Sequence, residues 1–122
     1  MANAQSLSLE GGGAASFTGI EPQTSAQFAA EEGISLQVVL GQTSTHAALK
    51  LAAGRIDIAV VPPDAYRAMS NGVGPSFEQG DQAKRLALNI RALFAFSAGT
   101  FHAVTWADSG IEDWEDLEGK RI

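Results

Sequence analysis

The sequence predicts an α/β fold with a mostly parallel sheet and flanking helices, and three observations lead to this prediction. Short alternating or apolar stretches, which are typical of strands, recur along the chain. Segments with helical spacing or helix-capping residues lie between the first three of these stretches, and glycine or proline marks most boundaries between segments. Strands that alternate with helices pair in parallel, because each crossover returns the chain to the same end of the sheet.

The strands are predicted from their side-chain patterns. Leu7 and Leu9 alternate with serines, which predicts a strand that ends at Glu10. A largely buried strand, "ISLQVVLG", follows, and two prolines end the third, "IDIAVVPP". The four strands predicted after the first cover residues 34–41, 56–63, 90–97 and 100–107.

The clearest predicted helix runs from Gln42 to Gly54. Thr43 or Ser44 can cap it, since a side-chain oxygen satisfies a free N–H of the first turn. The segment 15–33 also has apolar residues at helical spacing, but Gly19 and Pro22 are expected to interrupt it.

After the third predicted strand, the sequence patterns indicate less regular structure. Asp64 can cap a short helix that Asn71-Gly72 ends. A loop follows from Gly72 to Gln82, with Pro75 inside it and Phe77 as its apolar anchor. Near the end of the chain, three apolar residues recur at helical spacing and predict a further helix: Ile111, Trp114 and Leu117. The large aromatic residues of this half are expected in the core: Phe94, Phe96, Phe101, Trp106 and Trp114. Because Ile122 falls where a further strand should begin, we expect an incomplete chain.

Composition excludes several classes of protein. Eight basic and fourteen acidic residues give a net charge of −6, and the scattered basic residues do not predict a nucleic-acid surface. Without cysteine there are no disulfides and no thiolate sites. No apolar run is long enough to cross a bilayer, so we expect no membrane insertion. The start "MANAQS" lacks a signal's charged and apolar regions and is compatible with the tail left by signal removal.

Three segments follow the carboxyl ends of predicted strands, where ligands bind in α/β sheets. They are Gly11–Thr18, Gln42–Thr45 and Pro62–Asp64. Backbone N–H and hydroxyl groups with few cations suit a small carboxylate held by hydrogen bonds. The predicted ligand-binding residues are Gly12, Gly13, Ala15, Ser16, Phe17, Thr18, Thr43, Ser44, Thr45, Pro63 and Asp64. No catalytic residue, metal ion or cofactor is predicted.

Alternative explanations exist for each of these features. A glycine-rich turn after a strand is as often a tight connection as a binding loop, and Thr43, Ser44 and Asp64 can act only as helix caps. No phosphate-binding or dinucleotide motif is present, and Glu10 beside the glycines would repel phosphate. His46 near Ser44 is a weak candidate for a nucleophile pair, because no acid is spaced to orient it.

Taken together, the segments resemble the TAXI family of solute-binding proteins, which serve TRAP-type transporters. The likeness covers nearly the whole chain and lies in the order and spacing of "GGGAASFT", "GQTSTHAALKLAAGRIDIAVVPPDAYRAMSNG" and "ADSGIEDWEDLEGKRI". By position, Ser16 and Phe17 match the hydroxyl and first aromatic residue of the family's glycine motif. Ser44 matches the serine of its Gly-Gly-Ser helix, and Asp64 matches its Gln-Ser-Asp acid.

The resemblance implies a two-lobed, type II periplasmic-binding fold whose lobes close on a small organic anion. Residues 1–5 would be a tail, 6–107 the first lobe, and 108–122 the start of the crossover into the second. The loaded protein would dock on TRAP-type permease subunits in the bacterial periplasm. A first lobe without its returning strands is expected to associate or to be unstable.

This sequence departs from the family at its binding segments. Thr18 replaces a tyrosine, Gln42 and Thr43 replace two glycines, and Pro62 and Pro63 replace polar residues. Ala47 replaces an asparagine. A less polar solute, with a carboxylate beside an apolar body, is therefore expected. The alternatives are an effector-binding regulatory domain of the same architecture and a small α/β enzyme.

Overall fold

A strand at Ser6–Glu10 (β1) forms the centre of a three-stranded parallel sheet with the order β2-β1-β3. The computed structural model describes residues 6–74, 77, 80–100 and 102–121. Strand β2 (Ser35–Val39) pairs with β1 along its whole length, and β3 (Ile58–Ala59) pairs with Leu9 and Glu10. The predicted α/β fold with a parallel sheet is confirmed in this coarse form, although the third strand is much shorter than expected.

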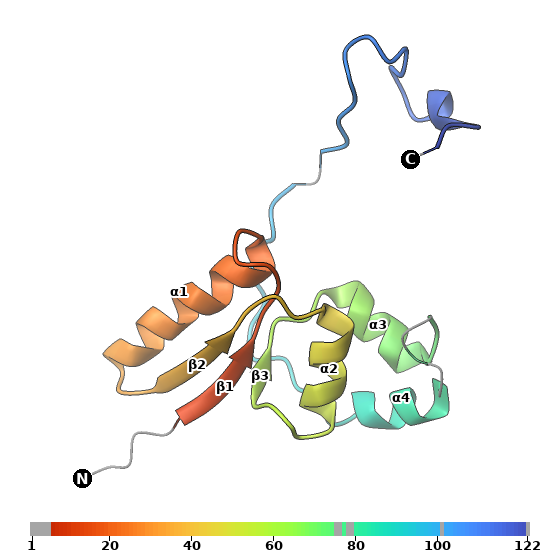
Figure 1. The fold of residues 1–122 in the computed structure, drawn as a ribbon. Helices are drawn as coiled ribbons and strands as arrows, with labels where there is room; N and C mark the ends of the chain where they lie inside the picture. The colour runs from red at the N-terminus through yellow and green to blue at the C-terminus, as the bar shows by residue number, and fades with distance from the viewer. Residues whose placement is uncertain (1–5, 75–76, 78–79, 101, 122) are drawn as a thin grey trace.

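The helices lie on both sides of this sheet (Figure 1). Helix α1 (Phe17–Glu31) connects β1 to β2, and α2 (Ser44–Ala52) connects β2 to β3. The two crossovers run in opposite directions along the sheet, and right-handed connections of that kind place their helices on opposite faces. The carboxyl ends of all three strands therefore face the same edge, and each leads into the start of a helix.

The main buried cluster lies among three helices and not under α1. Helices α3 (Pro63–Asn71) and α4 (Gly80–Ala87) pack with α2 around Met69, which is fully buried. The other buried members of this cluster are Ala48, Ala52, Phe77, Ala83 and Ala87. Phe77 is buried as predicted, but helix α4 begins within the stretch predicted to be a loop. No apolar helical pattern predicts α4, because its buried residues are the small alanines Ala83 and Ala87.

Helix α1 is continuous, so the predicted interruption at Gly19 and Pro22 is wrong. Proline has no N–H, and the carbonyl of Thr18 therefore lacks its usual helical donor. The backbone N–H of Gly12 donates to that carbonyl instead, at 3.0 Å. Pro22 is fully buried against the loop, so the residue expected to break the helix joins it to the end of β1.

The predicted strands over 90–97 and 100–107 are not formed in the described residues. The residues from 91 to 98 make no backbone hydrogen bond to another described element, and a strand has no stability without a partner. Phe94, Phe96, Trp106 and Trp114 are exposed and not in the core as expected. Figure 1 shows the C-terminal segment leaving the body past the start of α1, ending in a short 3-10 turn, η1 (Glu115–Leu117), where a helix was predicted.

Some predictions fall outside the described residues. These are the tail at residues 1–5, Pro75, Phe101 and the strand entry at Ile122. The division into a first lobe at 6–107 and a crossover at 108–122 stays a prediction.

Gly19 offers a test of how tightly the loop packs on α1. A Cβ at this position would lie 2.1 Å from the carbonyl oxygen of Gly13, closer than any real contact. Gly to Ala in a helix normally stabilises by about 1 kcal/mol. We expect Gly19→Ala to have the opposite sign and to lower the free energy of unfolding by about 1–3 kcal/mol, because the loop must move.

Urea unfolding followed by circular dichroism measures this difference. Ala30→Gly, at an exposed position of the same helix, is the matched control and should cost about 1 kcal/mol through propensity alone. A Gly19→Ala variant as stable as the parent would contradict the packing described for the loop.

Candidate functional site

The glycine loop after β1 is held by backbone hydrogen bonds to its neighbours. Gly11 donates to Val39 at 2.9 Å, and its own carbonyl accepts from Gln42 at 3.1 Å. The carbonyl of Gly12 accepts from Gly41 at 2.8 Å. These bonds join the first predicted binding segment, Gly11–Thr18, to the second, Gln42–Thr45.

Close packing explains why two of these glycines carry no side chain. A Cβ on Gly11 would lie 2.5 Å from the carbonyl oxygen of Thr18 and 2.6 Å from the Pro22 ring. A Cβ on Gly12 would lie 2.1 Å from the Thr18 hydroxyl. At Gly13, by contrast, the nearest atom to a Cβ would be the Ser16 hydroxyl at 3.9 Å, so packing leaves this third glycine unexplained.

The hydroxyls of the loop face each other. Ser16 is the N-cap residue of α1, but its hydroxyl donates to the carbonyl of Gly13 at 2.7 Å and makes no side-chain cap. The same hydroxyl lies 2.9 Å from that of Thr18. The N–H groups at the start of α1 therefore receive no side-chain acceptor from the cap residue.

The second predicted segment begins α2 without the expected cap. Thr43 is the N-cap residue, yet neither its hydroxyl nor that of Ser44 makes a capping hydrogen bond. Ser44 and Thr45 are half-buried, and Thr43 is exposed. The prediction that one of these hydroxyls caps the helix is wrong, and the N–H groups of its first turn make no bond to any described residue.

The third segment differs most from its prediction. Pro62 is the N-cap residue of α3 and Pro63 begins the helix, so Asp64 lies in the first turn and does not cap it. Asp64 is 93% exposed in its side chain and pairs weakly with Arg67 at 3.4 Å. The strand before it is joined to β1 by the bond from Val60 N–H to the Glu10 carbonyl. Asp64 makes no contact with the other predicted segments among the described residues.

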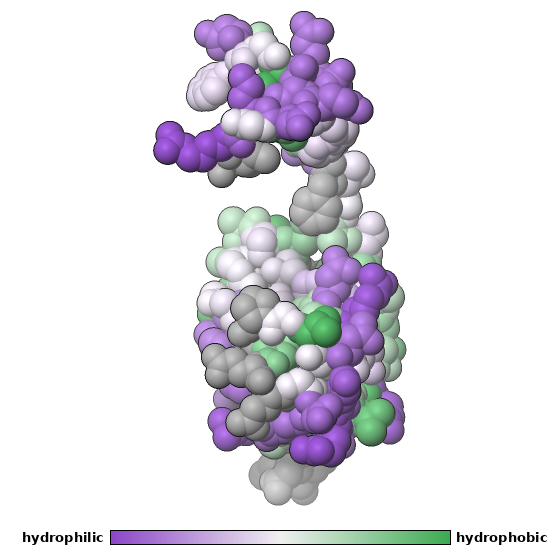
Figure 2. All heavy atoms as spheres, turned by 90° about the vertical axis from the view of Figure 1, so that its right-hand side faces the viewer, coloured by the Kyte–Doolittle hydropathy of each residue, from purple (hydrophilic) through white to green (hydrophobic). Residues whose placement is uncertain are grey.

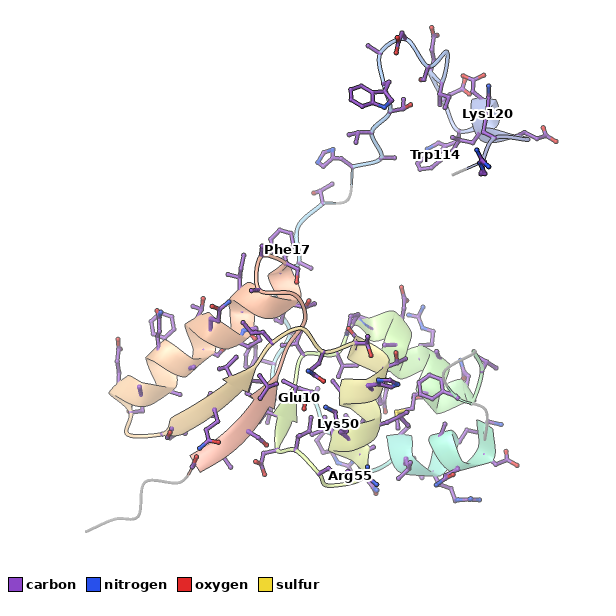
Figure 3. The ribbon with its side chains drawn as sticks, in the orientation of Figure 1. Glu10, Phe17, Lys50, Arg55, Trp114 and Lys120 are labelled. Carbon is purple, nitrogen blue, oxygen red and sulfur yellow. The ribbon has the colours of Figure 1, made fainter. Side chains whose placement is uncertain are left out.

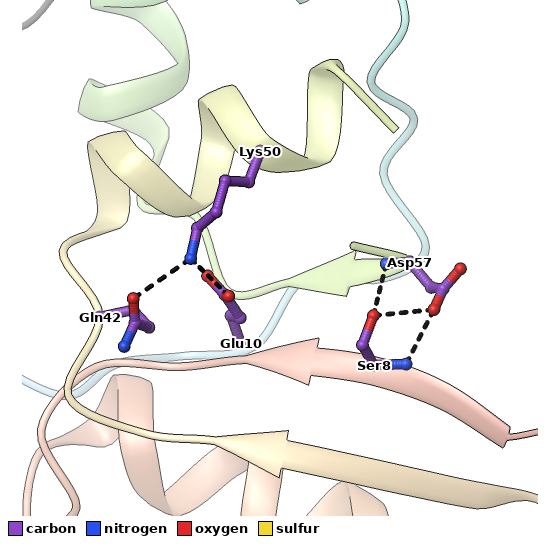
Figure 4. A network of polar contacts seen from close by, with 5 residues as sticks. All are labelled: Ser8, Glu10, Gln42, Lys50 and Asp57. Atoms are coloured by element: carbon purple, nitrogen blue, oxygen red, sulfur yellow. Dashed lines mark hydrogen bonds and ion pairs between the residues drawn. The ribbon is translucent and has the colours of Figure 1, made fainter. Parts of the chain in front are cut away.

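The sequence-based prediction missed a buried ion pair below the loop (Figure 4). Glu10, at the end of β1, accepts a hydrogen bond from the Lys50 ammonium of α2 at 2.5 Å. Lys50 also donates to the side-chain oxygen of Gln42 at 3.2 Å. The Glu10 side chain is only 7% exposed, and its Oε2 atom has no partner among the described residues. In the sequence, Glu10 is only an acid at the end of a predicted strand, and nothing near it indicates that Lys50, 40 residues away, is its partner.

A second polar link joins β1 to the residue before β3. The Asp57 carboxylate accepts from the N–H and the hydroxyl of Ser8, both at 2.8 Å, and the N–H of Asp57 donates back to that hydroxyl at 3.0 Å (Figure 4). The Ser8 N–H, and next its hydroxyl, lower the pKa of Asp57 below the usual 3.8. Ser8 and Glu10 thus form a polar stripe on the face of β1 under α2.

Neither histidine side chain makes a hydrogen bond to another described residue. For His46, whose side chain is exposed, this means that the nucleophile pair with Ser44, only a weak candidate in the sequence, is not formed. Across residues 6–74, 77, 80–100 and 102–121, no three acidic or histidine side chains gather as a metal site would need. Within those ranges no helix has the length and apolar character needed to span a membrane. The absence of catalysis and of a cofactor stays a prediction.

No family model, curated protein or solved structure matches this chain. The resemblance to the TAXI family therefore stays a prediction, and a function must be argued from the site itself.

Removing Lys50 tests the buried ion pair. We expect Lys50→Met to lower the free energy of unfolding by about 3 kcal/mol, because the Glu10 carboxylate would stay buried without a partner. Glu10→Gln in the Lys50→Met background should recover part of this loss, since no charge then remains. Urea unfolding of the parent and both variants measures the effect. Equal stability of all three would show that the pair is solvated.

The link between Ser8 and Asp57 predicts a dependence on pH. Because the pKa of Asp57 is lowered by folding, its stabilising contribution is present above the unfolded pKa. That contribution is lost as the pH falls through the lower folded pKa. Ser8→Ala removes the hydroxyl but keeps the backbone N–H, which is the larger cause, so it should raise the pKa of Asp57 only part of the way towards 3.8, which an NMR titration of its carboxyl carbon measures. Ser70→Ala, which removes a hydroxyl bonded only to a backbone carbonyl, should leave it unchanged.

Proposed function

We propose that this chain binds a small organic anion, a solute with a carboxylate beside an apolar body, without chemical conversion. The site is the carboxyl edge of the sheet, where the connections after β1 and β2 are bonded to each other. The observation that carries the proposal is a set of backbone N–H groups at this edge that have no acceptor in the described protein.

These donors come from two connections that are bonded to each other. In the first connection they belong to Gly13, Ala14, Ala15, Phe17 and Thr18, and in the second to Ser44, Thr45 and His46. Both sets lie at the start of a helix, where the helix dipole adds a partial positive charge. An anion can therefore be bound by the backbone alone, as it is at many helix N-termini.

Because Lys50 is already paired with Glu10, we expect the ligand carboxylate to be held by hydrogen bonds and not by an ion pair. The Lys50 ammonium is bonded to Gln42 of the second connection and is already occupied by Glu10. A ligand carboxylate would meet N–H and hydroxyl groups and not a free cation. The buried Glu10 also disfavours multiply charged anions such as phosphate, because like charges repel strongly where water is excluded.

The apolar part of the solute would contact the start of α1. Phe17 is the first residue of α1 and is 57% exposed, with its ring next to Gly99 of the C-terminal segment (Figure 3). Ala14 and Ala15 are exposed next to it. An exposed aromatic ring beside polar donors is typical of binding sites, which combine apolar walls with a few polar groups that orient the ligand.

We further propose that this unit acts as the first lobe of a TAXI-like solute-binding protein. In that role it would close with a second lobe on its ligand in the bacterial periplasm and deliver it to a TRAP-type permease. The order of the quoted motifs supports this, as does a parallel sheet whose helix starts gather at one edge.

Thermal shift with small carboxylates tests the binding site. We expect phenylacetate to raise the melting temperature more than acetate at equal concentration, because only phenylacetate has an apolar body for Phe17. Removing the paired hydroxyls with Ser16→Ala and Thr18→Val should weaken binding about tenfold, because the bonds from Ser16 to Gly13 and between the two hydroxyls hold the loop, and each such bond contributes about 0.5–1.5 kcal/mol. Isothermal titration calorimetry gives the affinities.

Thr24→Val is the matched control for this experiment. Its hydroxyl is also on α1 and bonds only to the carbonyl of Ile20, away from the loop. Binding by this variant and by His46→Ala should equal that of the parent. If no carboxylate stabilises the protein, or if Thr24→Val weakens binding as much as the loop variants do, the proposed site is wrong.

A further inference from the structure

We propose that two copies of this chain associate by inserting the Trp114 side chain of one copy into a cavity between α2 and α4 of the other. We call residues Glu112–Glu118, which surround Trp114, the acidic knob. This proposal is independent of the proposed ligand site, which lies at the carboxyl edge of the sheet.

The cavity has the size and lining of an aromatic pocket. Its volume is about 220 Å³, and cavities of about 150 Å³ accept a benzene ring. Leu49 and Ala53 of the α2 end form one apolar side, and Leu86 of α4 forms the other. Gln82, Arg55 and the stem of Lys50 complete the lining. A pocket with apolar walls and polar groups at its mouth fits a large side chain such as an indole.

The mouth of the cavity carries uncompensated positive charge. Arg55 lines it, and Arg85 directly precedes Leu86. Neither makes an ion pair with a described carboxylate, whereas Lys84 pairs with Asp81 and Lys50 pairs with Glu10. In a chain with a net charge of −6, this is a local surface that favours an acidic partner.

The acidic knob is the complementary element. It contains five acids and no basic residue: Glu112, Asp113, Glu115, Asp116 and Glu118. Trp114, in the middle of them, is 73% exposed. An exposed tryptophan surrounded by carboxylates fits an apolar pocket with arginines at its mouth.

Hydrogen bonds within the knob hold it in shape. The Asp113 carboxylate accepts from the N–H groups of Glu115 and Asp116, at 3.1 and 3.3 Å. The Asp116 carboxylate accepts from those of Glu112 and Asp113, at 2.9 and 3.3 Å. A turn that is ordered before binding loses less entropy on association, so a small contact can still be effective.

The position of the knob points to a second copy as its partner. Trp114 and Arg55 lie at opposite ends of the molecule (Figure 3). Figure 2 shows the C-terminal segment standing apart from the body as a mostly hydrophilic lobe. In this arrangement the knob lies at the opposite end of the molecule from the cavity of its own chain, and two chains can exchange their knobs. Reciprocal exchange makes two identical contacts and closes a dimer.

Sedimentation equilibrium of the full chain tests the association. We expect a reversible monomer–dimer equilibrium in the micromolar range, since two small contacts bury less than the ~1,600 Å² of a standard interface. Trp114→Ala should weaken it at least about tenfold, as the loss of a central aromatic anchor does. Trp106→Ala is the matched control, because Trp106 is 83% exposed on the same segment but outside the knob.

Charge reversal shows whether the contact is between chains. A first variant, with Arg55→Glu and Arg85→Glu, should not associate with itself. A second variant, with Glu112→Arg and Glu115→Arg, should not associate with itself either. An equimolar mixture of these two variants should associate again, because the unaltered knob of one variant meets the unaltered arginines of the other. All four side chains are exposed, and circular dichroism confirms that both variants stay folded.

Three results would overturn the proposal. They are a parent chain that remains monomeric at all concentrations, a Trp106→Ala variant that weakens association as much as Trp114→Ala, and a mixture of the charge variants that stays monomeric. A monomeric parent would mean that the cavity has a different occupant.

Discussion

The contact between the glycine loop and the start of α1 is the constraint on which the rest of the proposed site depends. Pro22 leaves the Thr18 carbonyl without its helical donor, and the N–H of Gly12 takes that place. This bond requires the backbones to approach so closely that a Cβ on Gly11, Gly12 or Gly19 would overlap its neighbours. The loop is thereby fixed against the helix, and the N–H groups of Gly13, Ala14 and Ala15 have no acceptor among the described residues.

The polar stripe on β1 fixes the other side of the same edge. A strand in the middle of a parallel sheet normally buries apolar residues on both faces. Here Ser8 and Glu10 replace them on the face under α2, and each has a polar partner far away in the sequence. These links join β1 to α2 and to the residue before β3. They also occupy Lys50, and for this reason the proposed anion site relies on backbone N–H groups.

The two proposals use separate parts of the molecule and different chemistry. Backbone donors at the carboxyl edge of the sheet suit a small anion, whereas an apolar cavity between α2 and α4 suits a bulky side chain. Association through the acidic knob would leave the starts of α1 and α2 open to solvent. Ligand binding and self-association can therefore be measured independently on the same protein.

The sequence by itself determined the strand and helix order of the first 72 residues, because these elements carry strong local signals. Alternation defined β1, hydroxyl and alanine spacing defined α2, and Gly72 ended α3 in a left-handed conformation. It also placed the three predicted binding segments after strands, although the chemistry of that site is still a proposal.

Only the tertiary structure decided which expectations failed. Pro22 remains inside α1 because a donor arrives from outside the helix, and the partners of Glu10 and Asp57 are 40 and 49 residues away along the chain. The segment 90–97 has the composition of a strand but no neighbouring backbone to pair with, so it stays exposed. In each case the outcome depends on a hydrogen-bonding partner distant in sequence, which local patterns do not specify.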